Sequence, residues 1–151
     1  MNIIRATPAL ARAQSSWIVG MEPWRGLGYS AAPLGRYLGR MAKEREVWLA
    51  RGTERRAAPL GLVVVQDGFL LGGFVSLLAV RPEATGQGVG RALMEHVAAQ
   101  VFAKRPWLFI SCDASNVRAL SFYRKLGFKR VGRLPDLIKP KRVELLLRKG
   151  R

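Results

Sequence analysis

The chain is poor in the residues that build metal centres and disulfide frameworks. Its 151 residues include one cysteine, Cys112, and one histidine, His96. A single cysteine excludes an internal disulfide and a cysteine-cluster metal site, and a single histidine excludes a two-histidine metal centre. We therefore expect a protein that uses no metal and no covalent cross-link.

Long uncharged runs are absent as well. The longest spans 13 residues, from Gly68 to Val80, and a helix of that length is too short to cross a bilayer. Residues 1–14 carry two arginines and lack an apolar segment of signal-peptide length. We expect no membrane partner and a cytoplasmic location.

Acidic residues are scarce relative to basic ones. Lysine and arginine number 26 against 10 aspartate and glutamate residues, which gives a formal net charge of +16. A charge of that size creates a long-range positive field that favours anionic partners. The field alone leaves open a phosphorylated cofactor, RNA or an acidic protein as the partner.

The apolar pattern predicts one mixed α/β domain over residues 1–151. Thr7 is a typical helix cap, and the apolar stripe after it predicts a helix over residues 8–20. Asp67-Gly68 is typical of a tight turn, and Gly72-Gly73 indicates a bulge or bend. Periodicity predicts further helices over residues 31–43 and 116–126 and from residue 90 to residue 104, and strands over residues 46–50, 60–65, 69–80, 107–112, 128–131 and 143–147.

A glycine-rich loop follows the long central strand. Pro82 turns the chain, and Gly86, Gly88 and Gly90 lead into a helix. Glycines let a backbone approach a ligand closely, and the first N–H groups of a helix carry the positive end of its dipole. The segment therefore suits a pyrophosphate. Its spacing fits neither a Walker loop nor a dinucleotide-binding loop, and a turn whose glycines serve only tight packing is the alternative.

A second motif lies on the helix after residue 115. Asn116, Ala119 and Tyr123 are spaced three and then four residues apart, so their side chains share one helix face. A polar, a small and a phenolic side chain on one face favour a groove for an elongated polar ligand. The alternative is that Asn116 is only a helix cap, and Phe122 is best interpreted as a core aromatic.

Together the two segments resemble the acetyl-CoA-binding motifs of the GNAT superfamily of N-acetyltransferases, and the order of elements is similar over nearly the whole chain. The family's loop reads Arg/Gln-x-x-Gly-x-Gly/Ala. Gly88 and Gly90 match its glycines, whereas Thr85 stands at the Arg/Gln position. The resemblance implies a mixed α+β fold, with a mostly antiparallel central sheet, splayed middle strands and flanking helices. It also implies acetyl-CoA (coenzyme A) as co-substrate.

The resemblance implies a role for each matching residue. The backbone of the strand before the loop would pair with the pantetheine arm, and the loop amides would hold the pyrophosphate. Asn116 would bond the pantetheine side, and Tyr123 would be the general acid that protonates the leaving thiolate. The expected cofactor-binding residues are Leu78, Ala79, Val80, Gly86, Gln87, Gly88, Val89, Gly90, Arg91 and Asn116.

The acceptor amine must be neutral to attack the thioester directly, without a covalent enzyme intermediate. Relatives that act on ribosomal-protein N-termini have a glutamate where this chain has Ser111. Glu22 is the first candidate for the base or for the acceptor's counter-charge, and Glu46 is the second; simple solvation is the alternative for both. Cys112 is expected to be a small buried residue, and His96 a solvated helix residue.

The basic charge exceeds what the cofactor needs. Residues 104–151 hold 14 basic and 3 acidic side chains, a balance of +11, and Arg118, Arg124 and Lys125 are candidates for a 3′-phosphate contact. Such charge disfavours polyamines and favours zwitterionic or acidic acceptors. The expected function is an acetyl-CoA-dependent N-acetyltransferase with an unidentified amine acceptor, possible ribosome contact and a possible homodimer. The alternative is a basic nucleic-acid or ribosome-associated module that retains the fold.

Overall fold

A computed structural model describes residues 1–151. It contains seven strands in one sheet, in the order β1-β2-β3-β4-β5-β7-β6. Of the neighbouring pairs with an assigned register, β4 with β5 is parallel and the others are antiparallel. The expected mixed α+β fold is therefore confirmed. In chain order the elements are β1 (Asn2–Arg5), α1 (Pro8–Arg12), α2 (Ser15–Ile18), α3 (Ala31–Lys43), β2 (Val47–Arg51), β3 (Pro59–Phe69), β4 (Gly72–Val80), the 3-10 turn η1 (Pro82–Ala84), α4 (Val89–Phe102), β5 (Trp107–Asp113), α5 (Val117–Lys125), β6 (Lys129–Pro135) and β7 (Val143–Gly150).

The chain divides into two compact units. The first comprises Met1–Val65 and Leu77–Val97, and the second comprises Gln66–Ser76 and Ala98–Arg151. Strands β3 and β4 and helix α4 contribute residues to both. The expectation of a single domain stays a prediction.

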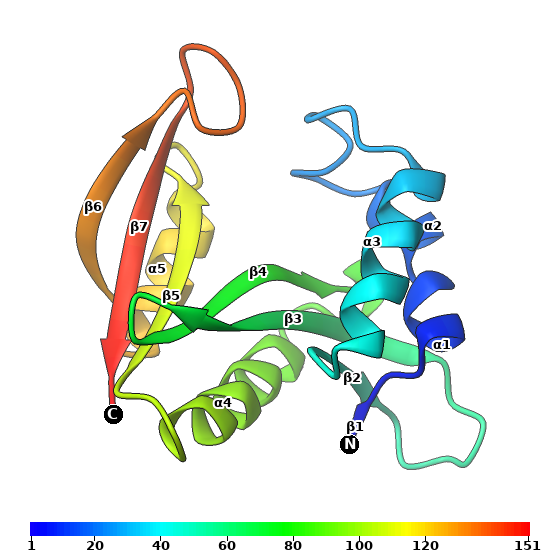
Figure 1. Ribbon diagram of the computed structural model, residues 1–151. Coiled ribbons are helices and arrows are strands. Elements are labelled where there is room, and N and C mark those ends of the chain that lie inside the picture. The colour runs from blue at the N-terminus through cyan, green and yellow to red at the C-terminus, as the bar shows by residue number, and fades with distance from the viewer. The chain divides into compact units, whose positions relative to one another are not determined.

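In the first unit, α1, α2 and α3 pack beside one another, as Figure 1 shows in blue and cyan. Thr7 caps α1 as predicted, because its Oγ1 accepts a hydrogen bond from Leu10 N–H at 3.2 Å. Side chains from these helices and from β2 and β3 form the core of the unit. Its fully buried members include Ile18, Leu38, Val47, Leu49, Leu62 and Val64.

The single helix predicted over residues 8–20 is wrong, since α1 and α2 are separate. Gln14 lies at the break and is buried. Its Nε2 donates to Leu10 O at 2.9 Å, and its Oε1 accepts from Trp17 Nε1 at 2.8 Å. The buried amide is thus satisfied locally, which a pattern of apolar residues does not reveal.

The second unit is built on β5, β7 and β6, which are neighbours in Figure 1. Leu108, Ile110, Leu145 and Leu147 from β5 and β7 are buried, together with Phe128 after α5. The pairing of β4 with β5 extends from Gly72↔Trp107 to Val75↔Ile110 only, although both strands continue beyond it. The short ladder agrees with the expected splayed middle strands.

The β3–β4 turn differs from the prediction. Asp67 and Gly68 lie within β3, and the turn is made by Leu70 and Leu71, with φ of 45° and 63°. A Cβ added to Gly72 would overlap the carbonyl oxygen of Trp107, so only glycine fits where β4 meets β5. This distant contact sets the start of β4 and outweighs the local turn preference. It also explains Gly72 better than the predicted bulge does.

One further difference from the prediction lies at the edge of the sheet. Strand β1, which pairs with β2 as an edge strand, was not predicted, because residues 2–5 show no polar–apolar alternation.

No helix in the structure has the length and apolar character needed to span a membrane.

The contact at Gly72 predicts a large effect of one methyl group. Gly72→Ala should lower the free energy of unfolding by about 1–3 kcal/mol, because the new Cβ overlaps the Trp107 backbone. The matched control is Gly132→Ala in β6, whose Cβ would meet Leu146 Cβ at an ordinary 3.4 Å. Urea unfolding followed by circular dichroism measures both. Equal stability of the two variants would contradict this account of the β4–β5 pairing.

Candidate functional site

The first unit holds the end of β4 and the glycine-rich loop. Ala79 is buried in the core, while Leu78 and Val80 on the other face are half-buried. Arg81 fixes the exit from the strand: its N–H donates to Leu60 O at 2.8 Å and its Nε to Pro59 O at 2.7 Å. The guanidinium also lies 4.8 Å from the ring centroid of Trp17. The strand therefore enters the loop from a rigid anchor.

The loop itself presents backbone rather than side chains. Gly86 and Gly88 both have φ of +80°, and a Cβ at either position would meet no atom within 4 Å. Both residues are exposed. Residues with side chains rarely adopt this backbone conformation, so the two glycines keep the surface over the loop open.

Helix α4 begins directly after these glycines. Ala92 N–H donates to Gly88 O at 3.0 Å, which makes Gly88 the cap residue. The N–H groups of Gly88, Val89, Gly90 and Arg91 consequently have no partner inside the helix. A pyrophosphate would satisfy them and would meet the positive end of the helix dipole. The residues present thus fit the phosphates of acetyl-CoA.

Close packing holds the start of α4 against the strands. Gly61 of β3 leaves no room for a side chain, since a Cβ there would lie 2.9 Å from Val89 Cγ1 and 3.0 Å from Ala79 O. The loop side chains turn back toward the preceding turn. Thr85 Oγ1 donates to Arg81 O at 3.4 Å, and Gln87 Nε2 donates to Glu83 O at 3.1 Å.

Glu22 lies in the loop between α2 and α3 of the first unit, and its side chain is 58% exposed. Its Oε1 accepts from Arg25 Nε at 3.2 Å, and its Oε2 accepts from Gly26 N–H at 3.1 Å. The carboxylate therefore organises its own loop. The second candidate, Glu46, directly precedes β2, where its N–H donates to Met41 O and its C=O accepts from Val65 N–H.

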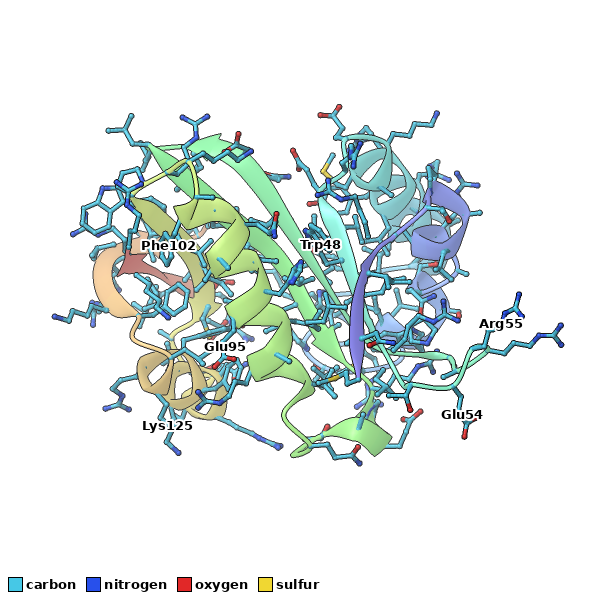
Figure 2. All side chains as sticks on the ribbon, turned by 90° about the horizontal axis from the view of Figure 1, so that it is seen from below. Trp48, Glu54, Arg55, Glu95, Phe102 and Lys125 are labelled. Atoms are coloured by element: carbon cyan, nitrogen blue, oxygen red, sulfur yellow. The ribbon has the colours of Figure 1, made fainter.

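His96 differs in part from the expectation of a solvated helix residue, because its side chain is half-buried. Its ring packs edge-on against Trp48, which is labelled in Figure 2, with 4.2 Å between the ring centroids. Its Nε2 is buried without a hydrogen-bond partner. Burial, and then the nearby Arg5 guanidinium, lower the pKa of His96. The neutral imidazole serves packing in the first unit.

The second unit holds Asn116 and Tyr123, both on α5. Asn116 is the cap of this helix, and its Oδ1 accepts from Ala119 N–H at 3.1 Å. The capping interpretation is thus observed, and the amide nitrogen of Asn116 takes no part in that bond. Arg118, Arg124 and Lys125 are exposed on the same helix, and Figure 2 labels Lys125.

Tyr123 is only 8% exposed. Its ring packs edge-on against Phe122 and Phe128, with centroids 5.2 Å and 5.9 Å away. Burial, and to a smaller degree the nearby Cys112, raise the pKa of Tyr123. The phenol accordingly keeps its proton at neutral pH, as a general acid must.

Cys112 on β5 is buried, as predicted. Burial, together with the carboxylates of Glu144 and Asp113, raises the pKa of its thiol to about 12. Thiolates rather than thiols are nucleophiles, so Cys112 is unsuited to attack a thioester.

Sequence reasoning missed one polar residue beside Cys112, namely Glu144 on β7. Glu144 pairs across the sheet with Asp113, and its Oε2 is buried with no hydrogen-bond partner. Burial, and then the Asp113 carboxylate, raise the pKa of Glu144, while Arg142 lowers it. The available signal was a single acid in the apolar segment Val143–Leu147.

No group of three or more histidine, cysteine or acidic residues in the structure is placed to hold a metal ion. The structure places the loop residues together in the first unit, and Asn116 and Tyr123 together in the second. Glu22 lies elsewhere in the first unit, where its carboxylate bonds to its own loop.

Residues 43–130 match the family described as "Acetyltransferase (GNAT) domain". Two curated relatives are named peptidyl-lysine N-acetyltransferase YjaB. The protein from Salmonella typhimurium is 38% identical over 91 residues, or 55% of this chain and 60% of the relative. The protein from Escherichia coli is 34% identical over 99 residues, or 64% of this chain and 60% of the relative. This chain thus aligns with less than two thirds of either relative.

Among solved structures, an aminoglycoside 6′-N-acetyltransferase complexed with coenzyme A superposes with a TM-score of 0.79. It is 16% identical, and the alignment covers 99% of this chain and 97% of that one. At that identity the likeness shows the fold alone. The family match extends over more than half of the sequence, and this chain therefore belongs to the GNAT family of acetyltransferases.

Proposed function

We propose that this protein transfers the acetyl group of acetyl-CoA to a primary amine. The observation that carries the proposal is the exposed loop in which Gly86 and Gly88, both at φ of +80°, precede the unpaired amides of α4. Such amides suit a pyrophosphate. The coenzyme A complex of a protein with the same fold supports the same ligand.

Each site residue then has a part in binding or proton transfer. The amides of residues 86–91 hold the diphosphate, the backbone of residues 78–80 pairs with the pantetheine arm, and Asn116 bonds the pantetheine side. Tyr123 donates its proton to the departing thiolate. The phenol is protonated over the physiological pH range, as a proton donor must be, although burial makes it a weaker acid than an exposed tyrosine.

The acceptor in this proposal is the side-chain amine of a lysine in a peptide or protein. The printed names of the two relatives support it. The balance of +11 over residues 104–151 favours a lysine in an acidic sequence context. Glu22 supplies the acceptor's counter-charge, and a cytoplasmic location belongs to the same proposal. The comparisons give no support to the alternative of a nucleic-acid-binding module.

Gly88→Val should abolish the binding of coenzyme A. Valine disfavours φ of +80°, and its side chain would occupy the open space above the loop. The matched control is Gly28→Val, because Gly28 is also exposed, with φ of +78° and no neighbour within 4 Å. Thermal unfolding with and without coenzyme A measures binding through the ligand's stabilisation of the folded state. A thermal shift in Gly88→Val equal to that of the control would contradict the placement of the diphosphate.

Tyr123→Phe should lower kcat by roughly a hundredfold with little change in coenzyme A binding, because it removes only the proton donor. Release of free thiol from acetyl-CoA, with a lysine-containing acidic peptide as acceptor, measures turnover. Tyr29→Phe, at an exposed tyrosine, is the control. If turnover of Tyr123→Phe equals that of wild type, Tyr123 is not the acid.

The variant Glu22→Gln tests whether Glu22 acts as the acceptor's counter-charge or as the general base. An exposed charge that only attracts the acceptor should change KM by roughly fivefold or less and leave kcat intact. Glu44→Gln, also exposed and acidic, is the control for a general loss of charge. Steady-state kinetics with the same peptide distinguishes the two roles, since a large fall in kcat would identify Glu22 as the base.

A further inference from the structure

Glu144 lies on β7, close to the turn between β5 and α5 in the second unit. Ala114 N–H, just after β5, donates to Val143 O at 2.8 Å, and Asn116 N–H donates to Asp113 O at 2.9 Å. The first bond ties the start of β7 to the end of β5, and the second ties the cap of α5 to the same turn. Glu144 is therefore positioned by the segment that carries Asn116.

The carboxylate of Glu144 differs from that of its neighbour in its hydrogen bonds. Asp113 Oδ1 accepts from Ser115 N–H at 2.8 Å, and Asp113 Oδ2 accepts from Arg142 Nε at 3.0 Å. Glu144 Oε2 is buried and has no partner at all. Buried polar atoms in native proteins are nearly always hydrogen-bonded, so an exception calls for an explanation.

A cationic N–H donor is the partner that a buried carboxylate oxygen requires. Arg142, whose charge acts on Glu144, is already committed to Asp113, with Nη2 2.9 Å from Asp113 Oδ2. The proposed reaction brings a second cation, since a lysine amine with a pKa near ~10.4 arrives protonated at neutral pH. Oε2 of the Glu144 carboxylate lacks a hydrogen-bond donor, and the protonated amine of the acceptor is such a donor.

We propose that the carboxylate of Glu144, a residue that is only half-buried as a whole, binds the acceptor's ammonium group and removes its proton before acetyl transfer. This inference rests on the proposed function and names the residue that acts on the acceptor. Glu144, and not Glu22, is then the base, and Glu22 keeps the role of an exposed counter-charge.

The proton and electron balance of the step is closed. The ammonium N–H bond breaks, its proton moves to the Glu144 carboxylate, and the freed electron pair forms the N–C bond to the acetyl carbonyl. The C–S bond breaks and its pair stays on sulfur, which takes the proton of Tyr123. Tyr123 regains a proton from the new amide nitrogen, and Glu144 releases its proton to water. The products are the acetylated amine, the free thiol and one proton.

The groups around Glu144 set the pH dependence of the step. Asp113 on β5 is the cross-strand partner of Glu144, and Arg142 lies two residues before Glu144 in the chain. Cys112 lies on β5 next to Asp113. Burial and Asp113 outweigh Arg142, so the pKa of Glu144 lies above its ordinary value. Only the ionised form accepts a proton, so the rate should rise with pH through this raised pKa.

Carbon-13 NMR of the glutamate carboxyls of the whole protein tests the inference without turnover, with Glu144→Gln identifying the signal. The probe is n-butylammonium chloride, which carries the end of a lysine side chain. We expect Glu144 to titrate above ordinary glutamates, and the probe to lower its pKa because a bound cation favours the ionised form. An ordinary pKa, or one that the probe leaves unchanged, would overturn the proposal.

Kinetics with two peptides gives the second readout. One peptide has a lysine and a blocked N-terminus, and the other has a free α-amine and no lysine. Glu144→Gln should lower kcat/KM for the lysine peptide by roughly a hundredfold and remove the acidic limb of its pH profile. The α-amine peptide should lose less, because a pKa near ~8 leaves far more neutral amine.

Glu54→Gln is the matched control, since Glu54 extends outward from the β2–β3 loop in Figure 2, and its kinetics should equal those of wild type. A Glu144→Gln profile identical to that of wild type would overturn the inference while the proposed function stands. If coenzyme A fails to stabilise wild type, the proposed function fails, and the NMR titration still decides whether Glu144 binds an ammonium group.

Discussion

The backbone conformation of two glycines is the constraint on which the proposed site depends. Gly86 and Gly88 adopt φ of +80°, and this allows β4 to end and α4 to begin with amides that no side chain covers. The anchor at Arg81 and the close packing at Gly61 hold this arrangement in the first unit. Binding through amides also explains how Thr85 can replace the family's Arg/Gln position, because a backbone cradle does not depend on that side chain.

In the proposed mechanism the second unit supplies the two residues that transfer protons. Burial raises the pKa of both Tyr123 and Glu144, with opposite uses. In the proposal the phenol, which is protonated at neutral pH, is the proton donor, whereas a carboxylate with a raised pKa becomes a stronger base near neutral pH. Cys112 lies beside Glu144, and its raised pKa removes it from nucleophilic chemistry. Burial in this unit therefore raises the pKa of a phenol, a carboxylate and a thiol.

The large positive charge bears on partners more than on stability. Several of its members form exposed ion pairs, such as Arg91 with Glu95 at 3.5 Å, and pairs of this kind contribute little to folding. The uncompensated excess instead raises the local concentration of anions. In the proposed function the same field would attract both the phosphorylated co-substrate and an acidic peptide segment that carries the acceptor.

The sequence by itself determined the features that depend on neighbouring residues. The helix over residues 31–43, the Thr7 cap, the glycine loop and the capped helix after Asn116 all follow from local spacing, and the structure agrees. Local chemistry suffices there because a turn, a cap or an amphipathic helix is set by residues only a few positions apart.

Only the tertiary structure decided the features that depend on distant contacts. The turn at Leu70–Leu71 follows from the fit of Gly72 against Trp107, which lies far along the chain. The packing of the His96 ring against Trp48, and the unpaired oxygen of Glu144 beside Asp113, likewise arise between separate elements. A periodic pattern records which side chains are apolar. It does not record which partner each one meets, and that partner sets hydrogen bonding, burial and pKa.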